Sequence, residues 1–252
     1  MKTISAVIIT LNEECNIARC LQSLQGVADE IIVVDSGSTD RTQEICKSFG
    51  VKFIYQKWLG YGAQKNFANS LATYDYVLSL DADEALSDKL RESILSMKSG
   101  NAVDIYAFNR CTNYEGKWIK HCGWYPDTKP RLWKNGIAEW SLDEVHERLL
   151  LPKNAKMQHL KGDLLHYTFT NLEEYIRLTN KYTSLGAEAY HAKGKKVTKM
   201  KVLFAPAWTF FRDYILRKGF LDGFCGFQVC LIAAFYTFLK YEKLRQSYEN
   251  EK

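Results

Sequence analysis

The sequence lacks several features that define common protein classes. Its 252 residues include seven cysteines but no C-x-x-C pair, and the cysteines are scattered along the chain. This pattern is typical of reduced thiols in a cytosolic protein and unlike a disulfide framework or a zinc site. Internal repeats and low-complexity segments are missing too, and Met1-Lys2 runs straight into a β-like segment without a signal peptide. We therefore expect the protein to act in the cytoplasm, where it is made.

Neither sign of charge is in large excess. The chain has 34 basic and 29 acidic side chains, a formal net charge of +5. That excess is too small to indicate nucleic acid, and no recognition motif accompanies it, so we expect no nucleic-acid partner. With 46% hydrophobic and 25% charged residues, the composition is that of a globular protein. The length suffices for one large α/β domain with an appendage.

Short apolar runs alternate with helical patterns in the first third of the chain. We predict strands over residues 5–10, 30–34, 51–55 and 76–80, with helices over 16–24, 40–49 and 64–72 between them. This order predicts an α/β fold with a doubly wound, mostly parallel sheet. Beyond residue 104, shorter strands are expected over 105–110, 131–134 and 145–151, and the chain becomes helical and basic after residue 170.

Polar residues follow three of the predicted strands. The first strand ends in Thr10-Leu11-Asn12-Glu13, the second in Asp35-Ser36-Gly37-Ser38 and the fourth in Asp81-Ala82-Asp83. Because ligands of open α/β sheets bind at the carboxyl ends of strands, these clusters predict one shared site. Asp35 can accept a hydrogen bond from a base or ribose, although Ser36 to Asp40 can also simply cap a helix.

The Asp81-x-Asp83 pair is the sharper signal. Two carboxylates on one turn provide oxygen ligands for Mg²⁺ or Mn²⁺, which neutralises a departing diphosphate. An isolated D-x-D pair is usually solvated, so its position at a strand end, after the other two clusters, carries the interpretation.

Three segments together resemble a known family. The runs S-A-V-I-I-T-L-N-E-E, E-I-I-V-V-D-S-G-S-T-D-R-T and L-S-L-D-A-D-E are similar to the nucleotide-binding segments of inverting family 2 glycosyltransferases, which have the GT-A fold. The stretches 60–68, 143–149 and 218–223 resemble lipopolysaccharide core glycosyltransferases of the glucosyltransferase type. This resemblance covers nearly the whole chain.

The resemblance implies roles for the strand-end residues. It places Asp35 and Gly37 on the nucleotide, and lines the base and ribose with Thr10, Leu11, Asn12 and Glu13. It assigns Mn²⁺ or Mg²⁺ to Asp83 and places Asp81 near the ribose or a metal-bound water, with Ala82 between them. It makes His166 a third protein ligand to the metal; the alternative is a structural histidine. It also places Lys65 beside the donor diphosphate, where leaving-group charge develops; the alternative is a surface lysine.

The resemblance also implies a carboxylate base, and the composition of one loop suggests a place for the acceptor. An inverting transfer needs one carboxylate to deprotonate the acceptor hydroxyl. Where the family usually has Glu-Asp, this chain has Asp143-Glu144-Val145-His146-Glu147, in which we favour Glu147 as the base, then Glu144, then Asp143. The loop containing Gly123, Trp124 and Tyr125 suits an acceptor sugar, although its aromatics are equally suited to a core.

The carboxyl-terminal part combines positive charge with apolar residues. Residues 191–218 contain eight Lys or Arg and one acid, and residues 223–239 contain no charge. A spanning helix needs about 20 apolar residues, so this shorter run favours a segment on an anionic membrane surface. The alternative is a basic helix packed on its own domain. We predict a glycosyltransferase domain over residues 1–170, with a nucleotide-sugar half (1–103) and an acceptor half (104–170), and a membrane-associating extension over 171–252.

The sequence thus predicts a metal-dependent inverting enzyme. It would move a hexose from a UDP-sugar to a lipid-linked or lipopolysaccharide core saccharide, as a peripheral protein on the inner face of the cell membrane. A nucleotidyltransferase-like or nucleotide-sugar-binding protein remains an alternative. A nucleotidyltransferase would carry a Gly-rich, basic loop after its first strand, where this chain has L-N-E-E. A non-catalytic scaffold would leave Asp81 and Asp83 unexplained.

Overall fold

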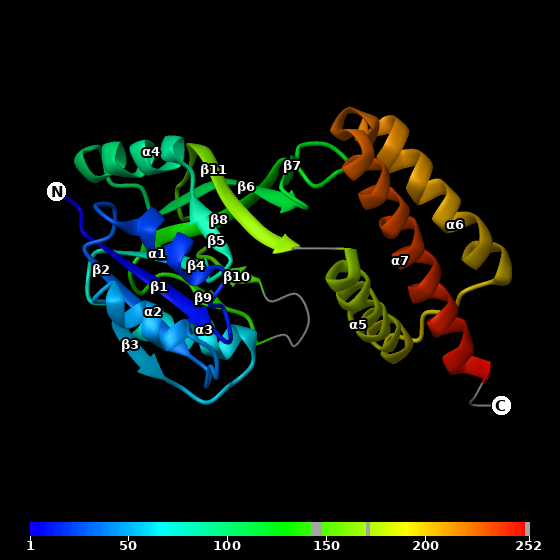
Figure 1. Ribbon diagram of the computed structural model, residues 1–252, viewed down its shortest axis with the longest axis horizontal. Coiled ribbons are helices and arrows are strands. Elements are labelled where there is room, and N and C mark those ends of the chain that lie inside the picture. The colour runs from blue at the N-terminus through cyan, green and yellow to red at the C-terminus, as the bar shows by residue number, and fades with distance from the viewer. Residues whose placement is uncertain (143–147, 170–171, 250–252) are drawn as a thin grey trace. The chain divides into compact units, whose positions relative to one another are not determined.

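The computed structural model describes residues 1–142, 148–169 and 172–249 (Figure 1). The chain forms two compact units: the first contains Met1–Arg110 and Asp127–Tyr167, and the second contains Cys111–Pro126 and Thr168–Lys252. The predicted division after residue 170 stays a prediction, and the two units are described separately below.

The first unit contains the predicted parallel sheet. Strands β1 (Ile4–Thr10), β2 (Glu30–Asp35), β3 (Lys52–Tyr55) and β4 (Tyr76–Asp81) pair in the order β3-β2-β1-β4, and all three pairings are parallel. Thr10 lies opposite Asp35, and Ile9 lies opposite Asp81. The three polar clusters therefore follow neighbouring strands at the same edge of the sheet, as the sequence predicts.

The same sheet continues in an antiparallel half. Strand β8 (Asp127–Lys134) pairs with β4, followed by β6 (Ile105–Tyr114), β11 (Met157–Phe169) and β5 (Glu84–Leu86). Two short strands, β9 (Glu139–Trp140) and β10 (Leu149–Leu150), form a separate pair. β6 and β8 are longer than predicted. The predicted strand over 145–151 is described only as β10, because residues 143–147 lie outside the described residues.

Helices α1 (Ile17–Leu24), α2 (Thr42–Ser48), α3 (Tyr61–Ser70) and α4 (Asp88–Ser99) belong to the first unit. The predicted apolar face of α1, which consists of Ile17, Cys20, Leu21 and Leu24, is fully buried in the main core. Helix α2 begins after Arg41, where the Oδ1 of Asp40 accepts a hydrogen bond from Thr42 N. Helix α3 begins three residues earlier than predicted, and Gly60 precedes it with a positive φ of 96°.

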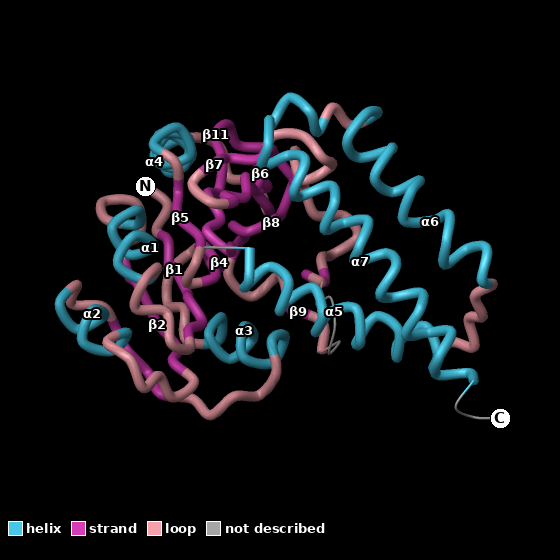
Figure 2. Tube along the Cα trace, turned by 45° about the vertical axis from the view of Figure 1, so that its right-hand side comes forward, coloured by secondary structure: helices cyan, strands magenta, loops and turns pink. Residues whose placement is uncertain are grey.

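The second unit is mainly helical. It contains β7 (Lys117–Ile119), α5 (Leu172–Ala192), α6 (Lys199–Phe211), a π-helical turn η1 (Arg212–Leu216), a 3₁₀ turn η2 (Gly219–Asp222) and α7 (Gly223–Glu249) (Figure 2). Helices α5, α6 and α7 pack together, and buried residues from the 111–126 segment and α7 form a small core. All seven cysteines are free in this structure.

Candidate nucleotide-sugar site

The loops after β1 and β2 are joined by hydrogen bonds. The backbone N of Asn12 donates to the Ser38 Oγ (2.8 Å), and the Asn12 Oδ1 accepts from the backbone N of Thr39 (2.8 Å). Asn12 has a positive φ of 55°, a conformation that asparagine tolerates better than most residues. The backbone N of Glu13 donates to Thr42 Oγ1 (2.8 Å). These bonds fix the two loops as one wall, with the side chain of Leu11 exposed on it.

Asp35 organises its own turn. Its Oδ1 accepts hydrogen bonds from the backbone N of Gly37 (2.9 Å) and Ser38 (2.8 Å), and its Oδ2 accepts one from the Ser38 hydroxyl. The side chain is buried, as is that of Thr10 on the neighbouring strand. Asp35 therefore closes the turn that follows β2, while Asp40 accepts a hydrogen bond at the start of α2, which agrees with the helix-capping alternative for residues 36–40.

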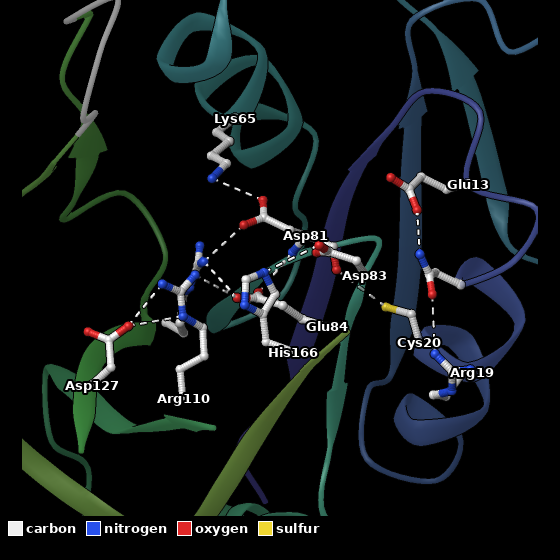
Figure 3. Close-up of polar contacts among 12 residues, drawn as sticks. Glu13, Arg19, Cys20, Lys65, Asp81, Asp83, Glu84, Arg110, Asp127 and His166 are labelled. Carbon is white, nitrogen blue, oxygen red and sulfur yellow. Dashed lines mark hydrogen bonds and ion pairs between the residues drawn. The ribbon is translucent and has the colours of Figure 1, made fainter. Parts of the chain in front are cut away.

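Asp81 lies between two buried cations at the end of β4. Its Oδ1 is 2.9 Å from Lys65 Nζ (Figure 3). Its Oδ2 is 3.0 Å from Arg131 Nη2. Both cationic side chains are about 4% exposed. Burial alone would raise the pKa of the Asp81 carboxyl, but Lys65 and Arg131 outweigh it and hold that pKa well below its usual range. Lys65 is therefore a buried site residue, and the surface-lysine alternative is wrong.

Glu84 links this ion pair to a wider network. Its side chain is fully buried, its Oε2 accepts from the backbone N of Asp81 (3.0 Å), and its Oε1 accepts from Arg131 Nη2 (3.0 Å). Arg110 reaches the same Oε1 at 3.7 Å and forms a closer pair with Asp127 (2.9 Å). Glu84, Arg110, Arg131 and Asp127 were not predicted from the sequence, although Glu84 directly follows the D-x-D pair.

An aromatic side chain covers the two cations. The ring centroid of Trp140 is 4.7 Å from Lys65 Nζ and 5.4 Å from the guanidinium carbon of Arg131. Trp140 itself packs edge-on against Trp133, with ring centroids 6.2 Å apart. Cations over an indole face are attracted by its π-electrons, and exclusion of water strengthens the ion pairs beneath. Trp140 was not predicted from the sequence, and its two-residue strand gives little local signal.

Asp83 and His166 lie together beside this network. The distance from Asp83 Oδ2 to His166 Nε2 is 3.3 Å, and the backbone N of Tyr167 donates to the carbonyl of Asp83 (2.9 Å). The antiparallel register of β11 and β5, which pairs His166 with Glu84, brings the two side chains together (Figure 3). Carboxylate oxygen is a ligand that suits Mn²⁺ and Mg²⁺, and imidazole nitrogen is a common ligand of first-row transition metals. Within residues 1–142, 148–169 and 172–249, no cluster of three or more His, Cys, Asp or Glu side chains is arranged to hold a metal.

The remaining predicted residues fall elsewhere. Asp143, Glu144 and Glu147 lie outside the described residues. Gly123, Trp124 and Tyr125 belong to the second unit, where the Trp124 ring packs edge-on against Tyr175 with centroids 5.9 Å apart. That contact favours the core interpretation for Trp124 over stacking on a sugar.

A family profile and two full-length relatives identify this chain as a glycosyltransferase. Residues 5–167 match the profile of Glycosyl transferase family 2. The chain belongs to that family. It is 35% identical to an uncharacterized glycosyltransferase of Rickettsia typhi, covering 98% of this chain and 88% of that protein. It is 32% identical to the lipopolysaccharide core biosynthesis glycosyltransferase LpsC of Rhizobium meliloti, covering 96% of this chain and 92% of that one.

Solved structures give more distant likenesses to this family 2 chain. TarS of S. aureus is 14% identical with a TM-score of 0.48, covering 99% of this chain and 92% of TarS. A glucosyl-3-phosphoglycerate synthase from Mycobacterium tuberculosis, crystallised with Mn²⁺ and UDP, is 24% identical with a TM-score of 0.35 and covers 46% of this chain and 45% of that one. The GT-A assignment made from the sequence is confirmed by the family match together with the parallel sheet order.

Proposed function

We propose that this glycosyltransferase is an inverting enzyme that moves a hexose from a UDP-sugar to a lipid-linked or lipopolysaccharide core saccharide. The part of this proposal that concerns the sugar donor rests on Asp83 and His166, whose side chains lie 3.3 Å apart. They lie at the sheet edge beside the ion pairs of Asp81 with Lys65 and Arg131. The acceptor half is supported by full-length similarity to a lipopolysaccharide core enzyme.

A divalent cation would offset the charge of the donor. The cations Lys65, Arg110, Lys129 and Arg131 pair with the carboxylates Asp81, Glu84 and Asp127. With Asp83 included, the four positive and four negative charges cancel when His166 is neutral. The diphosphate of a nucleotide sugar would add negative charge to this balanced site, and a bound divalent cation would offset it.

Asp83 and His166 would hold that cation as Mn²⁺ or Mg²⁺. Two protein ligands suffice, because Mg²⁺ usually keeps several waters and binds through one or two carboxylates and substrate phosphates. When bound, the metal stabilises the charge that develops on the departing diphosphate. The Asp81 carboxylate is already paired with Lys65 and Arg131. We therefore propose that Asp81 contacts the ribose or a metal-bound water, and that Asp83 binds the metal directly.

The other donor contacts follow from the strand-end loops. We propose that the wall made by residues 10–13 and the Asp35–Gly37 turn receives the uracil and ribose, with the exposed Leu11 against the base. Lys65 lies 2.9 Å from Asp81 and would bring positive charge to the diphosphate. For the acceptor, Glu147 would remove the hydroxyl proton as the sugar is attacked in line, with Glu144 and Asp143 as the next candidates.

Helices α6 and α7 support the proposed membrane contact. Large apolar side chains recur on each helix at helical spacing and are more than a third exposed: Met200, Phe204, Trp208 and Phe211 on α6, and Phe224, Phe227, Leu231, Phe235 and Phe238 on α7. Exposed apolar area of this extent marks an interaction surface. The stretch Gly219–Glu249 is also long and apolar enough to cross a membrane by length and composition. With eight cations in residues 191–218, we propose that the extension binds the anionic inner face of the cell membrane peripherally.

A thermal-stability screen tests the donor proposal. Nucleotide sugars would be added to the full-length protein with Mn²⁺ and with EDTA, because a ligand that binds the folded state raises the unfolding midpoint. We expect UDP-hexoses to raise the midpoint only with Mn²⁺, and UDP to share the effect. A midpoint that no UDP-sugar moves, or that moves equally in EDTA, contradicts the proposal.

A further inference from the structure

The second unit contains two buried carboxylates that the proposed function does not use. Asp213 lies in η1 and Asp222 ends η2, and each is about 4% exposed. Asp222 belongs to the K-G-F-L-D-G stretch of residues 218–223. Burying a carboxylate is costly unless it is paired, and a buried ion pair is often no more stabilising than apolar residues of similar volume. The hydrogen-bond and ion-pair partners of Asp213 and Asp222 therefore indicate which role these buried carboxylates have.

Asp222 holds His121 in one orientation. Its Oδ2 accepts from the backbone N of His121 (2.8 Å), and its Oδ1 lies 2.9 Å from His121 Nδ1. An ionised carboxylate only accepts hydrogen bonds, so Nδ1 carries the proton and the ring keeps Nε2 for another partner. The His121 side chain is about 31% exposed, and Lys117 Nζ donates to the Asp222 backbone carbonyl (2.6 Å).

Asp213 holds two arginines in the same way. Arg212 binds it through Nε (2.8 Å) and Nη2 (2.9 Å), and Arg217 Nη1 donates to its Oδ1 (3.0 Å). The Arg217 side chain remains 48% exposed, and Asp213 takes one of its five N–H donors. One buried carboxylate thereby fixes the fork of an accessible guanidinium.

Gly123 brings the Arg217 guanidinium onto the turn that carries His121. A Cβ at position 123 would lie only 2.4 Å from Arg217 Nη1, and the φ of Gly123 is +79°. The turn is closed by a hydrogen bond from Trp124 N to the His121 carbonyl (3.0 Å). Beneath it, Gly219 packs against the thiols of Cys122 and Cys230, to which a Cβ would come within 3.0 Å. The Arg217 guanidinium therefore lies against the turn that contains His121, and Gly219 and the two thiols pack beneath that turn.

We propose that Arg217 and His121 form a binding site for a phosphate group, as carried by a phosphorylated saccharide acceptor or by a phospholipid head group. A guanidinium fork matches phosphate oxygens in geometry as well as charge, and His121 Nε2 adds a donor when protonated. The neighbouring Lys218 and the exposed Leu216 and Phe220 place cationic and apolar side chains next to each other in the chain. A saccharide acceptor as the carrier of the phosphate rests on the proposed function, whereas phosphate binding by Arg217 and His121 does not depend on it.

Histidine NMR of the full-length protein tests the site. The five histidines are labelled with ¹³C and ¹⁵N, His121→Gln assigns the signal, and inorganic phosphate is titrated in at constant pH and ionic strength. We expect saturable shifts of the His121 signal, and roughly tenfold weaker binding in Arg217→Gln, since a charge-assisted bond is lost. Arg217→Lys should lie in between, because it keeps the charge and loses the fork. Arg177→Gln, on the exposed surface of α5, is the charge-matched control.

Binding to phosphatidylglycerol vesicles separates the two sources. If Arg217→Gln weakens vesicle binding more than Arg177→Gln does, the phosphate belongs to a head group. If Arg217→Gln and Arg177→Gln bind vesicles equally while only Arg217→Gln binds inorganic phosphate more weakly, the phosphate group belongs to a saccharide acceptor. The inference is overturned if phosphate does not shift the His121 signal, or if Arg217→Gln and Arg177→Gln respond to phosphate alike. UDP-induced stabilisation, measured in parallel, reports on the donor site independently.

Discussion

Replacing Arg131 with methionine should be the most damaging single change in the ion-pair network of the first unit. Arg131 is about 4% exposed and bridges Asp81 and Glu84, each at 3.0 Å. Arg131→Met keeps most of the volume but leaves the fully buried Glu84 with Arg110 at 3.7 Å as its nearest cation. Removing one partner of a buried pair costs about 3–5 kcal/mol, because the other charge stays buried. For a chain of this size that lowers the unfolding midpoint by roughly 6–20 °C.

A double-mutant cycle measures this effect by thermal unfolding and by urea unfolding followed through tryptophan fluorescence. Combining Arg131→Met with Glu84→Gln removes the stranded charge, so the double variant should be less destabilised than the sum of the single ones, by roughly 0.5–3 kcal/mol. Arg41→Met, whose pair with Glu44 is exposed, is the control and should leave the midpoint unchanged. A loss below about 1 kcal/mol for Arg131→Met, or strict additivity in the cycle, would refute the reasoning.

Two further predictions concern the base and the membrane. Glu147→Gln removes a proton acceptor at nearly constant volume, so UDP binding should persist while turnover falls by something like 10²–10⁴-fold; normal turnover in this variant together with loss in Glu144→Gln would assign the base to Glu144. The full-length protein should sediment with anionic vesicles, less so at high salt and much less with neutral vesicles, because salt screens the cations but not apolar burial. Deleting residues 191–252 should abolish sedimentation, whereas a full-length protein that stays in the supernatant at low salt means that the basic segment packs on its own domain.

The parallel half of the fold could be predicted because its signals are local. Runs such as Ala6–Ile9 and Ile31–Val34 are apolar and β-branched, and the observed strands agree with the prediction within a residue at most ends. The antiparallel half was harder. Strand β8 contains Pro130, which lies at a register shift against Ala107, and its first residues are polar. A proline and a broken alternation hide such a strand from pattern analysis.

The candidate site could likewise be predicted where its residues follow parallel strands, and not where they lie on antiparallel strands. The strand-end clusters were predicted because parallel strands end at one edge. His166 was also predicted, through the family resemblance, although it lies far along the chain from Asp83. The partners of Asp81 and Glu84 could not be found this way, since Arg110 and Arg131 come from antiparallel strands whose register no local pattern fixes. Nor does any local signal show that residues 111–126 pack with the helices beyond residue 168.

Calorimetric titration of UDP into the wild-type protein and Asp83→Ala, each with Mn²⁺ and with EDTA, tests the central proposal most directly. Because Asp83 and His166 lie 3.3 Å apart, we predict that wild type binds UDP at least about tenfold more tightly with Mn²⁺ than with EDTA. A factor of about ten corresponds to the loss of one interaction with a charged group. Asp83→Ala should lose that difference while keeping its circular dichroism spectrum. Equal metal-dependent affinity in the two proteins, or no UDP binding by the wild type with Mn²⁺, would contradict the account.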